Sequence, residues 1–417
     1  MRGFAASDLQ SSVVISAGLN PRLYGYLENL HQFYPDKNSI THKKVILKVS
    51  DFRSAQIQAK VLAKKAIWVY EFRVESGLNC GGHAFATEGF LLGPILEEFK
   101  QKRKQLAAEL YGIYSAAIIQ KNLEPAENPE QRITAQGGIG TAAEDRFLRD
   151  YYQLDATGWG SPFLLVPEVT NVDEETLADL VTANEDDFYI SDSSPLGVLF
   201  NNFRKSSAEK QRLNRIETGR PGSPCIKKYL CTNTEFTEQP ICTASREYQH
   251  LKLKQLETLD LPPQQYQQQA DAVTVKVCLC EGLCTSTYLK NDILKPKEST
   301  AVAICPGPNL GYFTSTYSLT EMVDHIYMRR DLLENADRPN LFVNELTLYV
   351  TYLKKDIAAH IDQLNDKKAK YFVKFRDQLL NGINYYTELL PQLDLNIENE
   401  DMFNQLLKAK DELALCL

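Results

Sequence analysis

Cysteines give the strongest chemical signal in this 417-residue sequence, because seven of the nine lie between Cys225 and Cys305. A first group runs from Cys225 to Cys242, and a second group begins at Cys278. Thiolates bind zinc ions or iron–sulfur clusters. Clustered cysteines in a chain without a secretion signal indicate metal or redox chemistry before disulfides. Buried thiols without a ligand are the alternative, above all for the second group.

A loop after a predicted strand gathers side chains that could do acid–base or covalent chemistry. Glu75, Ser76, Cys80 and His83 lie within nine residues of one another, and barrel active sites are built on such loops. Cys80 and His83 could act as nucleophile and base, or as a small loop residue and a helix-cap donor. Lys48, in the middle of an earlier strand, could face a cofactor or anion, or it could face solvent.

Two glycine loops could hold a phosphate group. They are Gln136–Gly140 and Thr157–Gly160, and each follows a predicted strand. Glycine lets a backbone approach a phosphate closely, and free N–H groups at the following helix start, near Thr141–Ala143, attract an anion. A tight strand-to-helix turn explains either loop alone. Two such loops on successive strands favour a phosphate site.

Short strands alternate with helices along the first 160 residues, a pattern typical of parallel α/β structure. The predicted strands cover residues 44–50, 67–75, 132–136 and 154–157. The predicted helices cover residues 52–65, 87–122 (as two helices, broken near Gly112) and 141–152. In the second strand Glu71, Arg73 and Glu75 share one face. Four strand–helix units are half of a (β/α)8 barrel, and glycine loops after the last two strands suit strands seven and eight. The predicted fold is therefore the C-terminal half of a TIM-type barrel.

A cysteine-rich segment and a mainly helical tail are expected after the barrel piece. Residues 1–42 are predicted to be irregular, apart from a helix around Pro21–Phe33. Residues 250–270 are predicted as a linker, and the runs 273–279 and 300–304 as strands. A helical packing face in the tail comprises Leu346, Val350, Leu353, Ile357, Ile361 and Leu364. The predicted organisation is a partial barrel over 1–200, a cysteine-rich segment over 201–312 and a helical region over 313–417.

The composition restricts the class of protein. Apolar residues make up 43% and charged residues 24% of the chain, as in a soluble globular protein. The formal net charge is −8, which argues against a general DNA or RNA binder. No run of about 18 apolar residues occurs, so a membrane span is not expected. The N-terminal residues lack the apolar core of a signal peptide, so the expected location is the cytoplasm.

Taken together, these features resemble the FMN-binding synthase domain of glutamate synthases, over roughly residues 40–250. The resemblance implies a (β/α)8 barrel that carries FMN and a cysteine-bound iron–sulfur cluster. Lys48, in Leu47-Lys48-Val49, stands at the family's strand lysine beside the flavin, and Gly81-Gly82 belong to its glycine loop. The cofactor-binding residues that the resemblance implies are Lys48, Ser76, Gly77, Gln136, Gly137, Gly138, Gly158 and Gly160.

The resemblance also implies a set of cluster ligands. Cys225 and Cys231 keep the family's spacing of five intervening residues, and Thr232-Asn233-Thr234 after them is similar to the family. Cys242 matches the third ligand after a six-residue insertion. The expected cofactors are therefore FMN and an iron–sulfur cluster, either [3Fe–4S] or [4Fe–4S].

The predicted function is an FMN- and iron–sulfur-dependent oxidoreductase of the glutamate-synthase-like class, acting on a CH–NH2 donor or a related small substrate. Lys48, Glu75, Cys80 and His83 are its catalytic candidates. A ferredoxin-like protein is the expected electron donor, because no nicotinamide-binding G-x-G-x-x-G motif occurs. A partner chain or an N-terminal segment is expected to supply the other half of the barrel.

Two alternatives stay open. In the first, the cysteines bind zinc or a structural cluster, the barrel piece is an inactive scaffold, and the helical tail recruits a protein or RNA. In the second, the protein binds flavin but uses no cluster in turnover. Visible absorption separates the first alternative from the main prediction, because flavin and iron–sulfur clusters are coloured and zinc is not.

Overall fold

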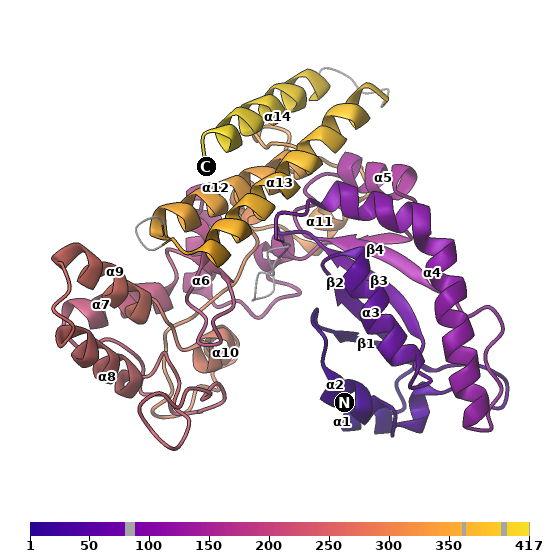
Figure 1. Ribbon diagram of the computed structural model, residues 1–417, viewed down its shortest axis with the longest axis horizontal. Helices are drawn as coiled ribbons and strands as arrows, with labels where there is room; N and C mark the ends of the chain where they lie inside the picture. Colours follow the sequence, from indigo (N-terminus) through magenta and orange to yellow (C-terminus); the bar gives the residue numbers. More distant parts are fainter. Residues whose placement is uncertain (80–87, 361–363, 393–397, 417) are drawn as a thin grey trace.

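A parallel five-stranded sheet forms the N-terminal part of the computed structural model, which describes residues 1–79, 88–360, 364–392 and 398–416. The strands are β1 (Ser11–Ile15), β2 (Lys43–Val49), β3 (Val69–Glu75), β4 (Arg132–Gln136) and β5 (Ala156–Gly158). They lie side by side in chain order (Figure 1), each parallel to the next. Consecutive barrel strands have this order. The predicted α/β class with a half-barrel sheet is confirmed at this level.

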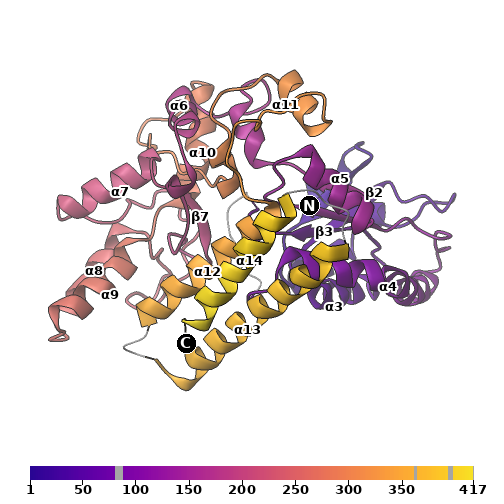
Figure 2. The same cartoon turned by 90° about the horizontal axis from the view of Figure 1, so that it is seen from above.

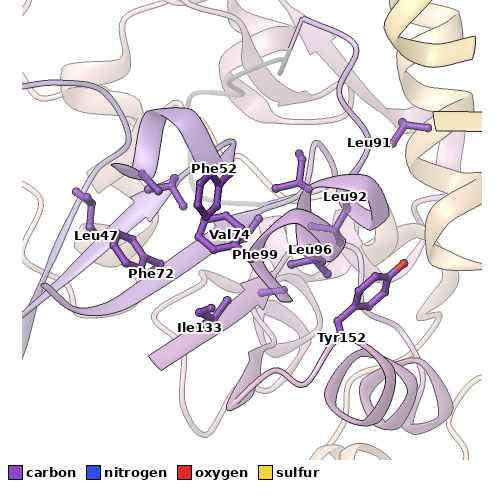
Figure 3. Packing of buried hydrophobic residues seen from close by; sticks show 14 of the residues in the cluster. Leu47, Phe52, Phe72, Val74, Leu91, Leu92, Leu96, Phe99, Ile133 and Tyr152 are labelled. Carbon is purple, nitrogen blue, oxygen red and sulfur yellow. The ribbon is translucent and has the colours of Figure 1, made fainter. Parts of the chain in front are cut away.

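Helices cover one face of the sheet and bury it. The connections between strands contain α2 (Pro21–Leu27), α3 (Phe52–Ala63), α4 (Leu92–Gln120) and α5 (Ala142–Tyr151). Asp51 accepts a hydrogen bond from the Ser54 N–H and so fixes the start of α3. Aromatic packing joins the layers (Figure 3): the ring of Phe99 on α4 lies 6.0 Å from Phe72 of β3 and 5.1 Å from Phe52 of α3, centroid to centroid.

Two predictions for this part of the chain are wrong. Residues 11–15 form strand β1, although they were predicted to be irregular. Helix α4 is continuous over 29 residues, although a break was predicted near Gly112. An added Cβ at Gly112 would meet nothing within 4 Å, so the residue faces open space. A glycine costs a helix about 1 kcal/mol, and burial of Leu110 and Tyr114 on the opposite face outweighs that cost.

Three C-terminal helices share the hydrophobic core of the sheet. They are α12 (Leu341–His360), α13 (Asp366–Leu389) and α14 (Glu398–Ala414), and Figure 2 shows them side by side. Their buried apolar residues belong to the same cluster as those of β2–β4 and α3–α5. Leu346, Val350, Leu353 and Ile357 of the predicted packing face are buried. Leu364 is exposed, and Ile361 lies outside the described residues.

The middle of the chain forms a helical part with a small antiparallel hairpin. The hairpin consists of β6 (Phe188–Ser191) and β7 (Phe200–Phe203). The helices are α6 (Glu174–Val181), α7 (Ser207–Glu217), α8 (Arg246–Glu257), α9 (Pro263–Thr274), α10 (Leu279–Lys290) and α11 (Leu319–Ile326). Helices α7, α8 and α9 lie on the opposite side of the molecule from the sheet (Figure 1), whereas α11 contacts α5.

The predictions of a linker and two strands in this part are wrong. The predicted linker over 250–270 falls on α8 and α9, and Leu256 and Ala270 in these helices are buried. The run 273–279 ends α9 and begins α10. In the run 300–304, Val302 accepts a backbone hydrogen bond from Ala208 of α7 instead of from a neighbouring strand. No helix among the described residues is long and apolar enough to cross a membrane.

Candidate functional site

A cavity of about 380 Å³ runs along one face of β3, β4 and β5 and reaches their carboxyl ends. Small-molecule sites have volumes of this order, and in parallel α/β sheets ligands bind at this edge. Five residues from the two glycine loops that were predicted to hold a cofactor line it: Gln136, Gly137, Gly138, Gly158 and Gly160. The fold therefore brings both predicted loops to one cavity.

Glu75 is the centre of a hydrogen-bond network beside this cavity. Its Oε1 accepts from Lys48 Nζ at 2.9 Å and from Gln136 Nε2 at 2.7 Å, and Asn79 Nδ2 donates to the same oxygen. These residues come from the carboxyl ends of β2, β3 and β4 and from the loop after β3. The Lys48 and Glu75 side chains are 22% and 10% exposed, so the ion pair is largely shielded from water. The structure thus brings together three of the predicted site residues.

Sequence reasoning did not single out a second polar group in the cavity. Arg73 Nε and Thr134 Oγ1 both donate to Glu71 Oε1, at 2.9 and 2.8 Å. All three residues line the cavity, and so does Arg132. The signal was present in the charged face of the second predicted strand, which carries Glu71, Arg73 and Glu75. Only the fold shows that the cavity opens onto this charged face of β3.

Close backbone packing explains the glycines at the end of β4. Gly137 and Gly138 have φ values of 103° and 76°, in the region that favours glycine. A Cβ on Gly137 would lie 2.7 Å from the backbone of Asn79, and one on Gly138 would lie 2.5 Å from the Leu78 side chain. These glycines therefore let the loop after β3 cross the end of β4, whatever the cavity binds.

The start of α5 is filled by a carboxylate of the chain itself. Glu144 Oε2 accepts from the N–H groups of Gly140 and Thr141, at 2.8 and 3.3 Å, in a capping box. The prediction that free N–H groups near Thr141–Ala143 attract an anion is therefore wrong for Thr141. Arg338 donates to Glu144 Oε1 at 2.7 Å and holds the carboxylate in place.

Two predicted cofactor-binding residues contact α12 and do not line the cavity. Ser76 Oγ and the Gly77 N–H both donate to Glu345 Oε1, at 2.8 and 3.0 Å. A Cβ on Gly77 would lie 2.5 Å from the Tyr349 hydroxyl, so glycine is needed there for close packing against the helix. Cys80 and His83, the predicted nucleophile and base, lie outside the described residues.

Trp159, between Gly158 and Gly160, carries an unsatisfied donor in the cavity wall. Its indole Nε1 is buried and has no hydrogen-bond partner. Buried N–H groups are nearly always paired. Trp159 lines the cavity, but its Nε1 atom is shielded even from water. This donor therefore does not face the cavity, and a molecule bound there would not reach it.

The cysteines predicted as cluster ligands lie close together in the helical part of the chain. The sulfur atoms of Cys225 and Cys231 are 3.9 Å apart. Burial raises the pKa of Cys225 to about 12, and the neighbouring Cys242 thiol adds to this. Burial also raises the pKa of Cys242 to about 11, against a backbone hydrogen bond from Ala244. The residues that the structure describes contain no group of three or more His, Cys, Asp or Glu side chains already arranged to hold a metal ion.

The comparisons with known proteins identify no family. No family model matches the sequence, and no curated protein matches it. Among solved structures, a mutant of FabK from Thermotoga maritima is similar, with 12% identity and a TM-score of 0.36. The alignment covers 76% of this chain and 66% of the FabK chain, slightly under two thirds of its length. Similarity at this level does not establish a shared fold.

Proposed function

We propose that the chain is a flavin-dependent oxidoreductase of the glutamate-synthase-like class, which exchanges electrons between FMN and an iron–sulfur cluster. The observation that carries the proposal is the convergence of both glycine loops on one polar cavity at the carboxyl ends of parallel strands. The cluster would be held by Cys225, Cys231 and Cys242. The substrate is a small molecule, either a CH–NH2 donor or a related compound.

The cavity residues fit a flavin phosphate and a polar ring system. Gly158 and Gly160 offer a close backbone approach, and Arg132 supplies positive charge beside the Arg73–Glu71 ion pair. Bound FMN would supply the electron-transfer chemistry. Lys48 and Gln136 are both held by Glu75, so a cation and an amide are fixed at the cavity edge before any ligand binds. Fixed groups of this kind orient a ligand at little entropic cost.

The remaining parts of the proposal concern partners and location. The electron donor would be a ferredoxin-like protein. The reduced thiols of the cysteine-rich segment suit the cytoplasm, where thiols are kept reduced. The three-part organisation over 1–200, 201–312 and 313–417 stays a proposal, with the helical tail packing on the barrel piece through a shared core.

The proposal is tested by an anaerobic visible spectrum of the purified protein, with released flavin, iron, sulfide and zinc quantified. We expect flavin bands together with iron and sulfide. Flavin without iron would limit the proposal to the cavity. A protein that binds neither flavin nor iron, also after incubation with FMN and with ferrous iron and sulfide, would contradict it.

A zinc-binding scaffold is the second candidate, and one distance favours it. Two sulfur ligands of a tetrahedral zinc ion lie about 3.8 Å apart, since the Zn–S bond is about 2.3 Å. The Cys225 and Cys231 sulfurs are 3.9 Å apart. In this alternative the helical tail recruits a protein or RNA. A colourless protein that contains zinc and binds no FMN would support the scaffold.

The exposed area supports a partner that completes the barrel. The chain has a mass of 47.3 kDa and exposes 21669 Å², whereas a folded monomer of this mass exposes about 16,000 Å². The excess is what an unfinished barrel face and open strand edges would give. Light scattering should therefore detect an oligomer or a complex with a second chain. A cooperatively melting monomer that binds FMN by itself would contradict the need for a partner.

A further inference from the structure

We propose that Cys278 is a fourth thiolate ligand, which completes one metal centre with Cys225, Cys231 and Cys242. The resemblance implied only the last three, all from a single stretch of chain. Cys278 comes from another element, because it is the N-cap residue of α10. The proposed function enters only through the identity of the metal. The ligand set rests on the contacts of the cysteine-bearing segments.

Backbone hydrogen bonds first join the segment of Cys225 to that of Cys242. The Ser223 N–H donates to the Ala244 carbonyl at 2.8 Å, and the Arg246 N–H donates to the Ser223 carbonyl at 2.9 Å. Ser223 lies two residues before Cys225, and Ala244 lies two residues after Cys242. The backbones that carry these two thiols are therefore fixed next to each other before a metal binds.

A fully buried glutamine then joins the segment of Cys242 to that of Cys278. Gln249 Nε2 donates to the Lys276 carbonyl at 3.2 Å and to the Thr243 carbonyl at 3.5 Å. Lys276 lies two residues before Cys278, and Thr243 follows Cys242 directly. Gln249 is 0% exposed, so water does not compete for these bonds. Hydrogen bonds therefore join all three segments, and each bonded residue of a segment lies one or two positions from its cysteine, apart from Arg246 and from Gln249 itself.

Cys278 and the Cys225 segment border one small cavity. Cys278 and Pro224, the residue before Cys225, both line this cavity of about 30 Å³. The two cysteine-bearing segments therefore meet there.

Two guanidinium groups lie beside the cysteine-bearing segments. Arg215 donates to Ser223 Oγ at 3.0 Å, and Arg246 Nε is buried with no hydrogen-bond partner. A centre with four thiolates keeps a net negative charge around Zn²⁺ or an iron–sulfur core, and these two cations would offset it.

Loading the centre requires side-chain rotation and proton release. Only the Cys225 and Cys231 sulfurs already lie in contact, so the thiols of Cys242 and Cys278 must turn toward them. Each sulfur that bonds to the metal gives up its proton to solvent. Because hydrogen bonds already fix the backbone of the three segments, only the cysteine side chains need to move.

The test uses the full-length protein, loaded anaerobically with Zn²⁺ alone or with ferrous iron and sulfide. Three forms are compared: wild type, Cys278→Ser and the control Cys284→Ser, whose thiol is exposed on the same helix. We expect Cys278→Ser to lose metal to EDTA at least about tenfold faster than wild type. Cys284→Ser should behave as wild type. In the iron arm, iron per chain should fall from about four to about three in Cys278→Ser. Comparing the samples loaded with Zn²⁺ and those loaded with iron and sulfide shows whether the centre binds zinc or an iron–sulfur cluster.

A second measurement needs no variant and covers a misfolded Cys278→Ser. Iodoacetamide is applied to the loaded wild-type protein, and the alkylated residues are identified by mass spectrometry. Cys278 should be protected until EDTA is added, whereas exposed Cys284 should react at once. Equal alkylation of Cys278 with and without metal would overturn the inference, and so would unchanged metal retention in Cys278→Ser. Flavin is quantified in the same samples, so the cavity proposal can fail while the ligand set stands.

Discussion

We expect Arg338→Met to lower the free energy of unfolding by about 3–5 kcal/mol, since it breaks a buried ion pair. Arg338 donates to Glu144 Oε1 and to Asn309 Oδ1, both at 2.7 Å, and to the Gly138 carbonyl at 2.6 Å. The Arg338 and Glu144 side chains are 5% and 8% exposed. The substitution leaves a carboxylate, an amide and a carbonyl without this partner in a nearly dry site. Urea denaturation at neutral pH measures the loss.

An exposed pair of the same residue types provides the control. Arg330 pairs with Glu321 at 2.6 Å, with side chains 53% and 34% exposed. Exposed pairs contribute at most about 1 kcal/mol, so Arg330→Met should change stability little. Arg338→Lys should lie between Arg338→Met and wild type, because one ammonium group cannot reach three separate acceptors as the guanidinium fork does. Equal effects at positions 338 and 330 would contradict the role given to burial.

Replacing Glu345 with alanine should destabilise the protein by about 3 kcal/mol or more, because it leaves three buried donors unpaired. The carboxylate accepts from Ser76 Oγ, from the Gly77 N–H and, at 2.7 Å, from the Leu92 N–H. These contacts join α12 to the loop after β3 and to the start of α4. Thermal or urea denaturation measures the effect. Glu412→Ala is the control, because Glu412 is exposed and pairs with exposed Lys354.

The ionisation of Glu345 adds a pH dependence of known sign. Burial raises its pKa above the ordinary 4.5. The folded protein therefore holds this proton more tightly than the unfolded chain does. The resulting stability is complete below about pH 4.5 and is lost as the pH rises through the folded pKa. Glu345→Gln cannot titrate, so its deficit relative to wild type should shrink from about pH 4.5 to about pH 8. A deficit that is constant over this range would contradict a raised pKa.

Local sequence patterns predicted the strands that carry the candidate site. Strands β2–β5 coincide with short apolar runs that are bounded by glycines or by helical segments. Such runs can be recognised without knowing which distant residues they contact. Strand β1 has only five residues, and its partners in β2 are 32 positions away. Nothing in its own sequence shows that pairing. The glutamines of 263–269 suggested a linker, yet α9 forms because its buried residues pack against α8.

The glycine loops of the candidate site could be predicted from the sequence, but the partners of its charged side chains could not. The residue types and spacing of Gly137, Gly138 and Gly158 were enough to predict the two glycine loops. The partners of Glu144 and Glu345 could not be predicted in this way, because Arg338 is 194 residues away from Glu144, and Ser76 is 269 residues away from Glu345. Such contacts depend on tertiary folding, which no local pattern encodes. The same holds for Cys278, whose place beside the Cys225 segment depends on long-range contacts such as that of Gln249 with Lys276.

The shared core of the sheet and the three C-terminal helices has a consequence for how the chain matures on the ribosome. Strands β1–β5 are synthesised within the first 158 residues, but the helices that finish burying their core span 341–414. Because a ribosome adds about 5–20 residues per second, roughly 13–50 s pass between the synthesis of β5 and the end of α14. During that time the apolar residues later covered by α12 stay exposed on the nascent chain. Such a protein should depend on chaperones during synthesis more strongly than its final stability suggests.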